Sequence, residues 1–264
     1  MAIFSFNRAI VRTPTEMVVN GLRAGEGPDP CFVALERQHH CYISALENAG
    51  LEVTELPPLA DFPDSVFVED AALVLSDTAI LLRPGAKSRS GEVAAIAPAM
   101  SDHFSEVIVI EAGFVDGGDI LVTSPKIFIG LSDRTDRQGA RALAEILTRH
   151  GVVSEIVQTP PDILHFKTGC ALLDEETIFA SAAMAATGIF AEFRVLEVPY
   201  GEEAAANMLR INDTILLPSG FPKTADQVAQ LHPNIVLLDV SEVAKIDGGL
   251  SCMSLRWNSD PDPR

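Results

Sequence analysis

Cys252 is the residue of this sequence with the clearest potential for nucleophilic chemistry. It lies in the stretch DGGLSCMSLRW, after Gly248 and Gly249 and inside a short apolar run. A free cysteine most often fills a buried gap, but a thiolate beside a general acid or base is a strong nucleophile. These eleven residues alone do not distinguish the two roles, so the other polar groups and the elements that carry them decide.

Acidic residues and a histidine precede three apolar segments that resemble one another. Asp61, Asp64, Glu69 and Asp70 precede AALVLSDTAILLRP, Asp116 and Asp119 lead into ILVTSPKIFIG, and His165 and Lys167 lead into GCALLDEETIFAS. A fourth segment, NMLRINDTILLPS, has Ala204 in the corresponding place and adds no obvious functional group. Carboxylates bind cations, and an imidazole can transfer protons to and from a group under attack by a thiolate.

Each of these four segments contains two apolar runs joined by a short polar turn. The second run is headed by an isoleucine, and these are Ile80, Ile127, Ile178 and Ile215. Turns such as Ser76-Asp77 are too short for a crossover helix, so the two runs are expected to pair as an antiparallel hairpin. Repeats of about 40 to 50 residues are typical of propellers, arrays and solenoids.

The first and last apolar segments lack hairpin mates of their own. They are NRAIVRTP and LSCMSLRW, and pairing them would close a ring of five units without exposed sheet edges. Helical stripes are expected between hairpins, within residues 31–50, 134–151 and 223–233. The prediction is an α/β fold, a five-bladed α/β-propeller whose N- and C-terminal strands close one blade; an α/β sandwich with accidental repeats is the alternative. Residues 1–257 are expected to form one domain, and 258–264 a flexible tail.

A ring would bring the chemically active residues to one end of its axis. Glu69, Asp116 and His165 fall 11, 11 and 13 residues before their aligned isoleucines, and Cys252 belongs to the closing unit. Equivalent positions in a repeat lie at equivalent heights in a ring. The sequence therefore predicts a site that combines carboxylates, an imidazole and a thiol.

Two arginines and one irregular loop could complete such a site. Arg89 and Arg134 each follow the second run of a hairpin and would clamp a carboxylate if both face the opening. The stretch NGLRAGEGPDP near the start could act as a lid or could be a plain surface loop.

Composition excludes several classes of protein. The chain has 264 residues, 47% of them hydrophobic, and a formal net charge of −18, which argues against nucleic-acid or anionic-membrane partners and suits a small cationic substrate. The sequence contains no run of about 18 apolar residues, so a membrane span is not expected. The N-terminus reads as a strand rather than a signal peptide, and the four cysteines lack C-x-x-C spacing, so a cytoplasmic location is expected.

Six motifs together resemble those of the dimethylarginine dimethylaminohydrolase family, in their order along the chain. They are PDSVFVED, RPGAKSR, DGGDIL, GLSDRT, LHFKTGC and GGLSCMSLRW, and the resemblance runs from about Arg8 to Trp257. It implies the pentein fold of the guanidino-group modifying superfamily, a five-bladed α/β-propeller. It also implies hydrolysis of Nω-methylated arginines (asymmetric dimethylarginine and monomethylarginine) to L-citrulline and an amine through a covalent cysteine thiouronium, without a metal or organic cofactor.

The resemblance also implies roles for individual residues. Cys252 matches the nucleophile, His165 the general acid and base, and Asp116 an acidic position that is Glu in some members. The substrate-binding positions are Asp64 for the α-amino group, Asp70 with Glu69 beside it for the guanidinium, Arg89 and Arg134 for the carboxylate, and Leu22 and Ile246 for backbone contacts.

Several alternatives remain open at this point. An arginine deiminase would use the same residues, although such enzymes usually carry an additional helical domain. A catalytically silent guanidino-amino-acid binding protein would have no need for both Cys252 and His165. A metal site at QHHC, His39 to Cys41, is disfavoured because adjacent residues of a helix point in different directions. The expected partner is a small cationic amino acid, and the expected assembly is a monomer or a homodimer.

Overall fold

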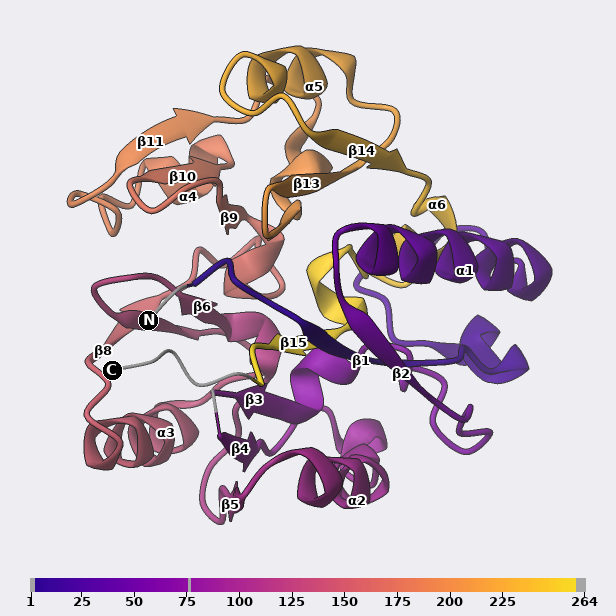
Figure 1. The fold of residues 1–264 in the computed structure, drawn as a ribbon, viewed down its shortest axis with the longest axis vertical. Coiled ribbons are helices and arrows are strands. Elements are labelled where there is room, and N and C mark those ends of the chain that lie inside the picture. Colours follow the sequence, from indigo (N-terminus) through magenta and orange to yellow (C-terminus); the bar gives the residue numbers. More distant parts are fainter. Residues whose placement is uncertain (1–2, 76, 260–264) are drawn as a thin grey trace.

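Five three-stranded sheets surround a common axis in the computed structural model, which describes residues 3–75 and 77–259 (Figure 1). In four of the sheets an antiparallel hairpin is followed by a helix and by a third strand parallel to the hairpin's second strand. In the first, Leu73 pairs with Ile80, and Ile80 pairs with Ile108. The predicted propeller and its hairpins are confirmed, whereas the third strand of each blade was not predicted. Ser76 of the first predicted turn lies outside the described residues.

The strands occupy three positions within their blades. The inner strands are β3 (Ala72–Val74), β6 (Ile120–Val122), β9 (Cys170–Leu172), β12 (Leu209–Ile211) and β15 (Leu255–Trp257). The middle strands are β4 (Thr78–Leu81), β7 (Ile127–Leu131), β10 (Thr177–Ala180), β13 (Thr214–Pro218) and β1 (Arg8–Arg12). The outer strands are β5 (Glu106–Val109), β8 (Ser154–Gln158), β11 (Arg194–Glu197), β14 (Ile235–Leu238) and β2 (Glu52–Leu56).

The two ends of the chain close the fifth blade. Strand β15 pairs antiparallel with β1, so that Arg8 lies opposite Trp257 and Ile10 opposite Leu255. Strand β2 then adds to β1 in parallel. The predicted closure is confirmed. As in the other blades, the inner strand faces the axis and pairs only with the middle strand of its own sheet.

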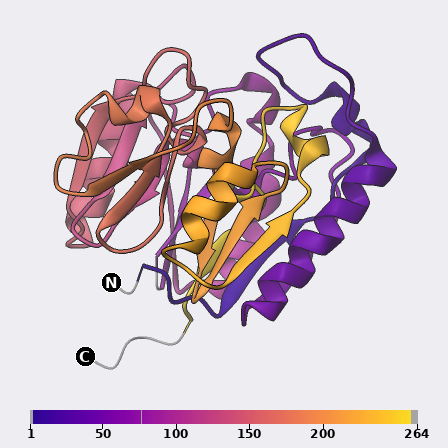
Figure 2. The same cartoon turned by 90° about the horizontal axis from the view of Figure 1, so that it is seen from above.

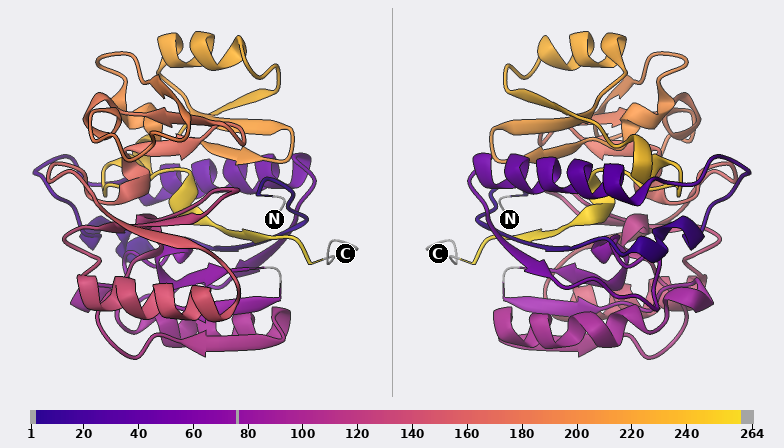
Figure 3. Two further views of the ribbon diagram at one scale, coloured as in Figure 1. Left: turned by 90° about the vertical axis from the view of Figure 1, so that its left-hand side faces the viewer. Right: turned by 90° about the vertical axis from the view of Figure 1, so that its right-hand side faces the viewer.

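Helices cover the outside of the ring. They are α1 (Phe32–Asn48), α2 (Glu92–His103), α3 (Arg137–Arg149), α4 (Ala182–Ala185) and α5 (Pro222–Ala229), with the short α6 (Ser241–Ala244) before the last strand. Figure 3 shows α3 and α1 running across opposite sides of the molecule. The helices expected within 31–50, 134–151 and 223–233 are present as α1, α3 and α5, and α2, α4 and α6 were not predicted.

Helix α3 shows how the sequence determines these outer helices. The Asp136 side chain accepts the Gly139 N–H at 2.7 Å and caps its start. Its apolar stripe is buried against the blade, with Leu143 and Leu147 fully inaccessible. Each such buried side chain contributes about 2 kcal/mol relative to exposure. The middle strands β4, β7 and β10 are buried along their whole length, so the core lies between them and the helices.

Short 3-10 turns precede the inner strands and divide the axis of the ring into two spaces. They are η2 (Val68–Ala71), η4 (Gly117–Asp119), η5 (Phe166–Thr168), η6 (Glu203–Ala206) and η7 (Ser251–Met253). On one side of these turns is a central channel of about 540 Å³ between the inner strands, and on the other is a small cleft. The loop of residues 20–30 rises at one end of the ring, and the described chain ends lie at the opposite end (Figure 2).

The chain just beyond the last strand is attached to the segment that precedes β1, in the fifth blade. The Asn258 side chain donates to Ser5 Oγ at 3.1 Å, and the Ser259 N–H donates to Asn7 Oδ1 at 2.9 Å. The rest of the predicted flexible tail, residues 260–264, lies outside the described residues. Among the helices of the described chain, none has the length and apolarity needed to cross a membrane.

Candidate active site

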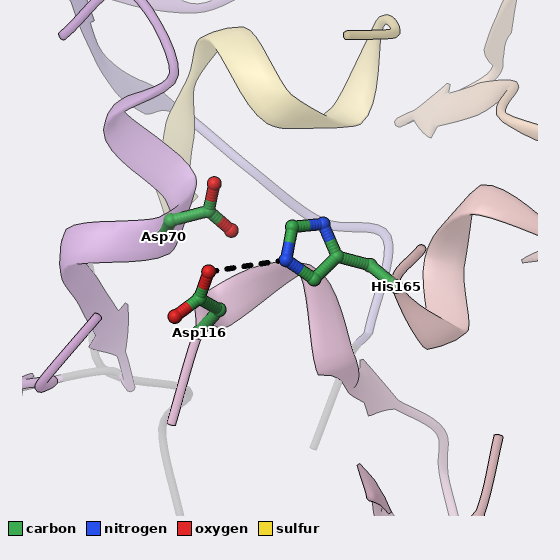
Figure 4. Close-up of side chains that lie close together, drawn as sticks. All are labelled: Asp70, Asp116 and His165. Atoms are coloured by element: carbon green, nitrogen blue, oxygen red, sulfur yellow. Dashed lines mark hydrogen bonds and ion pairs between the residues drawn. The ribbon is translucent and has the colours of Figure 1, made fainter. Parts of the chain in front are cut away.

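Three of the predicted site residues meet where three of the turns converge. Asp70 comes from η2, Asp116 directly precedes η4, and His165 directly precedes η5. Each offers a ligand atom within 4.8 Å of those of the other two, and all three residues are buried. Figure 4 shows both carboxylates pointing toward the imidazole ring. The ring therefore brings together residues that lie up to 95 positions apart in the chain (165 minus 70).

His165 is held by Asp116. Its Nε2 lies 3.1 Å from Asp116 Oδ2, and Asp116 Oδ1 accepts the Gly85 N–H at 2.7 Å. Gly118 permits this packing, because a Cβ there would lie 2.8 Å from the imidazole ring of His165. The second glycine of the DGGD motif is therefore required by the close approach of the imidazole.

The acidic surroundings keep His165 protonated. Burial alone would lower its pKa, but the carboxylates of Asp70, Asp116 and Asp119 outweigh burial and raise the pKa of His165 to about 9. Burial would likewise raise the pKa of Asp70, but Arg89 and His165 bring it down to about 2. At neutral pH, His165 is therefore an imidazolium beside the Asp70 carboxylate and can donate a proton.

Cys252 shares one cleft with these residues. The cleft is lined by Leu22, Asp64, Phe67, Asp70, Arg89, Arg134, Leu164, His165, Ile246, Asp247, Gly248 and Cys252. Burial, Glu69 and Asp70 raise the pKa of the Cys252 thiol to about 12. Burial and these two acids thus favour the thiol, and a bound cation would offset the acids that oppose the thiolate.

The loop of residues 20–30 is hydrogen-bonded to the mouth of the cleft. The Leu22 N–H donates to Asp64 Oδ1 at 2.9 Å, and the Ala24 N–H donates to Asp247 Oδ2. Burial raises the pKa of Asp64, although the Leu22 N–H, Arg89 and Arg134 oppose this effect. Ile246 is buried beside Asp247, whose φ of 58° is in the left-handed region. Asp64, Leu22 and Ile246 therefore all lie at the cleft.

The two arginines of the expected clamp lie at the cleft but differ in their partners. Arg89 is buried, with its guanidinium paired to Asp70 and Glu92 and donating to the Phe67 carbonyl at 2.9 Å. The guanidinium of Arg134 is partly exposed and has no ion-pair or hydrogen-bond partner within residues 3–75 and 77–259. Arg134 thus has a guanidinium available for a ligand, whereas most N–H groups of Arg89 already bind protein oxygens.

Glu69 is not brought into the cleft. Its carboxylate lies in the central channel, 2.6 Å from Lys167 Nζ and 3.2 Å from Arg256 NH2, and it accepts from Ser251 Oγ at 3.2 Å. The expected contact of Glu69 with a guanidinium ligand therefore does not arise in this geometry. The negative charge of Glu69 nevertheless acts on Cys252 through space and raises the pKa of that thiol.

Two buried acids without an expected role support the site. Asp119 accepts from Ser132 Oγ at 2.7 Å, from Thr135 Oγ1 at 2.6 Å and from the Phe166 N–H at 2.9 Å, so it ties the Arg134 loop to the turn of His165. The Glu92 carboxylate accepts a hydrogen bond from the Arg89 guanidinium. Burial raises the pKa of Glu92 to about 7, although the charge of Arg89 opposes this effect. In the sequence, the DGGD motif could have indicated a role for Asp119. The spacing of three residues between Arg89 and Glu92 could have indicated their ion pair.

The cluster of Asp70, Asp116 and His165 also has spacing suited to a metal ion. A metal would need His165 to lose its proton, which the surrounding carboxylates oppose. The Asp70 carboxylate is already bound by Arg89 and by the Gly118 N–H. In the QHHC stretch His39 is buried while His40 and Cys41 are exposed, so these side chains diverge. The geometry favours an organic cation at the acidic cluster.

Comparisons with known proteins extend these observations to nearly the whole chain. The family model described as arginine deiminase matches residues 59–219. The N(G),N(G)-dimethylarginine dimethylaminohydrolase of Pseudomonas aeruginosa is 39% identical over 96% of this chain and 100% of its own length, and that of Streptomyces coelicolor is 32% identical over 94% and 96%. A solved structure of the Pseudomonas aeruginosa protein, a cysteine-to-serine mutant complexed with citrulline, superposes with a TM-score of 0.93 over 96% of this chain and all of that one.

Proposed function

The chain belongs to the dimethylarginine dimethylaminohydrolase family, and from this membership we propose that it hydrolyses Nω-methylated arginines to L-citrulline and dimethylamine or methylamine. The observation that carries the proposal is that one cleft is lined by a thiol, an imidazolium and two carboxylates, from Cys252, His165, Asp64 and Asp70. A guanidinium is stabilised by resonance, so its attack needs a strong nucleophile, a group that holds the cation and an acid that protonates the departing amine.

Charge complementarity orients the substrate. The guanidinium binds beside Asp70, close to His165 and Cys252, because the carboxylate favours a cation there. The α-amino group binds Asp64, and the α-carboxylate binds Arg134, whose guanidinium has N–H groups to donate. Arg89 acts mainly through Asp70, which it holds in place.

The first half of the reaction forms a covalent intermediate. Binding of the cation offsets the acids that raise the pKa of Cys252, so the thiol proton leaves to solvent and the thiolate attacks the guanidinium carbon. The C–N bond to the methylated nitrogen then breaks as the imidazolium of His165 gives that nitrogen its proton. Dimethylamine leaves, and an S-alkylthiouronium remains on Cys252.

The second half releases the product. Neutral His165 takes a proton from water, which attacks the thiouronium carbon. The C–S bond breaks, the electron pair returns to sulfur, the remaining hydroxyl proton goes to solvent, and citrulline leaves. Asp116 orients the imidazole through both halves, since its carboxylate lies 3.1 Å from Nε2.

Substrate entry requires movement of the lid. The cleft has a free volume of only about 30 Å³, room for a few water molecules and not for an amino acid. The loop of residues 20–30 has two hydrogen bonds to the cleft wall, from Leu22 to Asp64 and from Ala24 to Asp247. We propose that this loop opens to admit the substrate and closes over it.

The test is citrulline release from asymmetric dimethylarginine, with arginine in a parallel reaction. Cys252→Ser is expected to abolish turnover while leaving binding of the methylated substrate nearly intact, and Cys41→Ser, an exposed cysteine on α1, is the matched control. Release mainly from arginine would assign the chain to deiminase chemistry. Binding without release by the wild-type protein would instead support the silent binding protein.

We also propose that residues 1–257 act as one catalytic domain in the cytoplasm, as a monomer or a homodimer, without nucleic-acid partners. All four cysteines lie in the described part of the chain and are unpaired, which supports a reducing compartment. Light scattering on the purified protein distinguishes the two assemblies, and cell fractionation tests the location.

A further inference from the structure

The fourth blade contributes a side chain to the nucleophile. Asn207 follows η6 and is 7% exposed. Its Oδ1 accepts the Ser251 N–H at 3.0 Å, and its Nδ2 lies 3.9 Å from Cys252 Sγ, within the range of a hydrogen bond to sulfur. The sequence had suggested no functional group in this blade, because Ala204 stands at the position equivalent to Glu69.

The orientation of the Asn207 amide follows from its neighbours. The Ser251 N–H is a donor and requires an oxygen, so Oδ1 must face the backbone of η7. The NH2 group is thereby directed at the sulfur. One short side chain thus contacts both the backbone before the nucleophile and the reacting atom.

Gly249 is shaped to receive this amide. A Cβ at residue 249 would lie 2.5 Å from Asn207 Cγ and 2.7 Å from Nδ2, so any side chain there would expel the amide. Gly249 is not among the residues with positive φ, so its backbone conformation does not require glycine. The approach of Asn207 accounts for the second glycine of DGGLSC.

A neutral donor suits this place. The cleft must accept a guanidinium, and a lysine or arginine beside the sulfur would repel it. An amide N–H stabilises a thiolate by hydrogen bonding without adding a positive charge. Glu69 and Asp70 oppose the thiolate, so a donor that acts on the sulfur itself has a clear use.

We propose that Asn207 is a positioning residue for the nucleophile: its Oδ1 holds the Ser251–Cys252 turn, and its Nδ2 directs the sulfur and stabilises the thiolate. This inference rests on the proposed function for the role of Cys252 as nucleophile. The contact itself is open to test without turnover.

The decisive variant is Asn207→Asp, which keeps the acceptor for Ser251 and replaces the N–H donor with oxygen. The rate of Cys252 alkylation by iodoacetamide is measured by mass spectrometry from pH 7 to 11. The profile is expected to move to higher pH by at least one unit, since the thiolate loses a donor worth about tenfold in its equilibrium and also faces a carboxylate. Asn207→Ala removes the donor without adding a charge and is expected to move the profile by about one unit. An unchanged profile in Asn207→Ala would overturn the proposal. The kcat for asymmetric dimethylarginine should fall by about tenfold or more. Its KM should stay within about threefold, because the amide acts on the sulfur rather than on the bound substrate.

The matched control is Asn234→Asp, the same change at an exposed position of the same blade, which should leave profile and kcat unchanged. Wild-type profile and kcat in Asn207→Asp would overturn the proposal. If the chain released no citrulline at all, the proposed function would fail, and a shifted alkylation profile in the uncharged variant Asn207→Ala would still support the contact.

Should Asn207→Asp not fold, the contact is tested by NMR on protein that retains Asn207. The side-chain 15N–1H signals of Asn207 at pH 7 are expected to shift in Cys252→Ser and to stay constant in Cys41→Ser. Signals that are unchanged in Cys252→Ser would overturn the proposal.

Discussion

The carboxylates of Glu69 and Asp70, neighbours in the chain, lie on opposite faces of the layer of turns that separates the cleft from the channel. Asp70 lines the cleft near His165, while Glu69 lines the channel with Lys167 and Arg256. One short turn therefore supplies both a cation-binding group and part of an ion-pair network behind the nucleophile.

Exchanging each acid for its amide should separate these roles. Asp70→Asn is expected to raise KM by about 10- to 100-fold, because a charge-assisted contact to the guanidinium is lost. Glu69→Gln should leave KM within about threefold but lower the free energy of unfolding by about 3 kcal/mol, because two largely buried cations lose their carboxylate. Steady-state kinetics and urea unfolding measure both. A large rise of KM in Glu69→Gln would place its carboxylate with the substrate after all.

The pH dependence of kcat/KM should reveal a reversed order of titration. The reaction needs a Cys252 thiolate and an imidazolium, with pKa values of about 12 and about 9. Below about pH 9, kcat/KM should rise about tenfold per unit as the thiol loses its proton. Above about pH 9 the rise of kcat/KM should stop. The fraction of protonated His165 then falls tenfold per pH unit while the fraction of Cys252 thiolate rises tenfold, so the two effects cancel.

Asp116→Asn provides the check on this profile. Removing that carboxylate lowers the pKa of His165, so the bend should move to lower pH. A bend unchanged by Asp116→Asn would show that His165 does not cause it.

Arg134→Ala should weaken binding of substrates that carry an α-carboxylate. Its guanidinium lines the cleft without a partner among the described side chains, so truncation leaves no buried acid unpaired. We expect KM for asymmetric dimethylarginine to rise by about 10- to 100-fold, while agmatine-like compounds without the carboxylate bind as before. Arg137→Ala, an exposed arginine on α3, is the control. An equal loss for both kinds of compound would refute the carboxylate contact.

His39 should make the fold sensitive to mild acid. Burial lowers the pKa of His39 to about 4, against the opposing charge of Glu55. The unfolded chain takes up a proton near the ordinary histidine pKa of about 6.5, so stability falls by up to about 3 kcal/mol between pH 6.5 and 4. His39→Leu should flatten this part of the urea-unfolding profile. The His39 Nε2 has no hydrogen-bond partner in the described structure, so the substitution breaks no hydrogen bond at that atom.

The hairpins and the ring closure could be predicted because tight turns leave only antiparallel pairing. The outer strands could not, because β5 and β11 are only half-buried and show no alternation of apolar and polar residues. Each outer strand follows a helix and pairs in parallel with the middle strand of its blade, and this pairing becomes evident only in the assembled blade.

The site was predictable to the level of residue type and not of side-chain direction. A 3-10 turn has about three residues per turn, so Glu69 and Asp70 must point different ways, but the sequence does not say which one faces the cleft. Asn207 escaped notice because it stands 8 residues before Ile215, whereas the aligned positions of other blades stand 11 to 13 before theirs. The turns differ in length from blade to blade, and spacing alone cannot follow them.

The pairing of β15 with β1 has a consequence for the order of synthesis. A ribosome releases Cys252 last among the residues of the cleft, only a few positions before the strand that completes the fifth blade. Without β15, β1 would have an unpaired edge, and the acids and imidazole of the cleft would lack a nucleophile. Closure of the fifth blade and completion of the site therefore depend on the same final segment of the described chain.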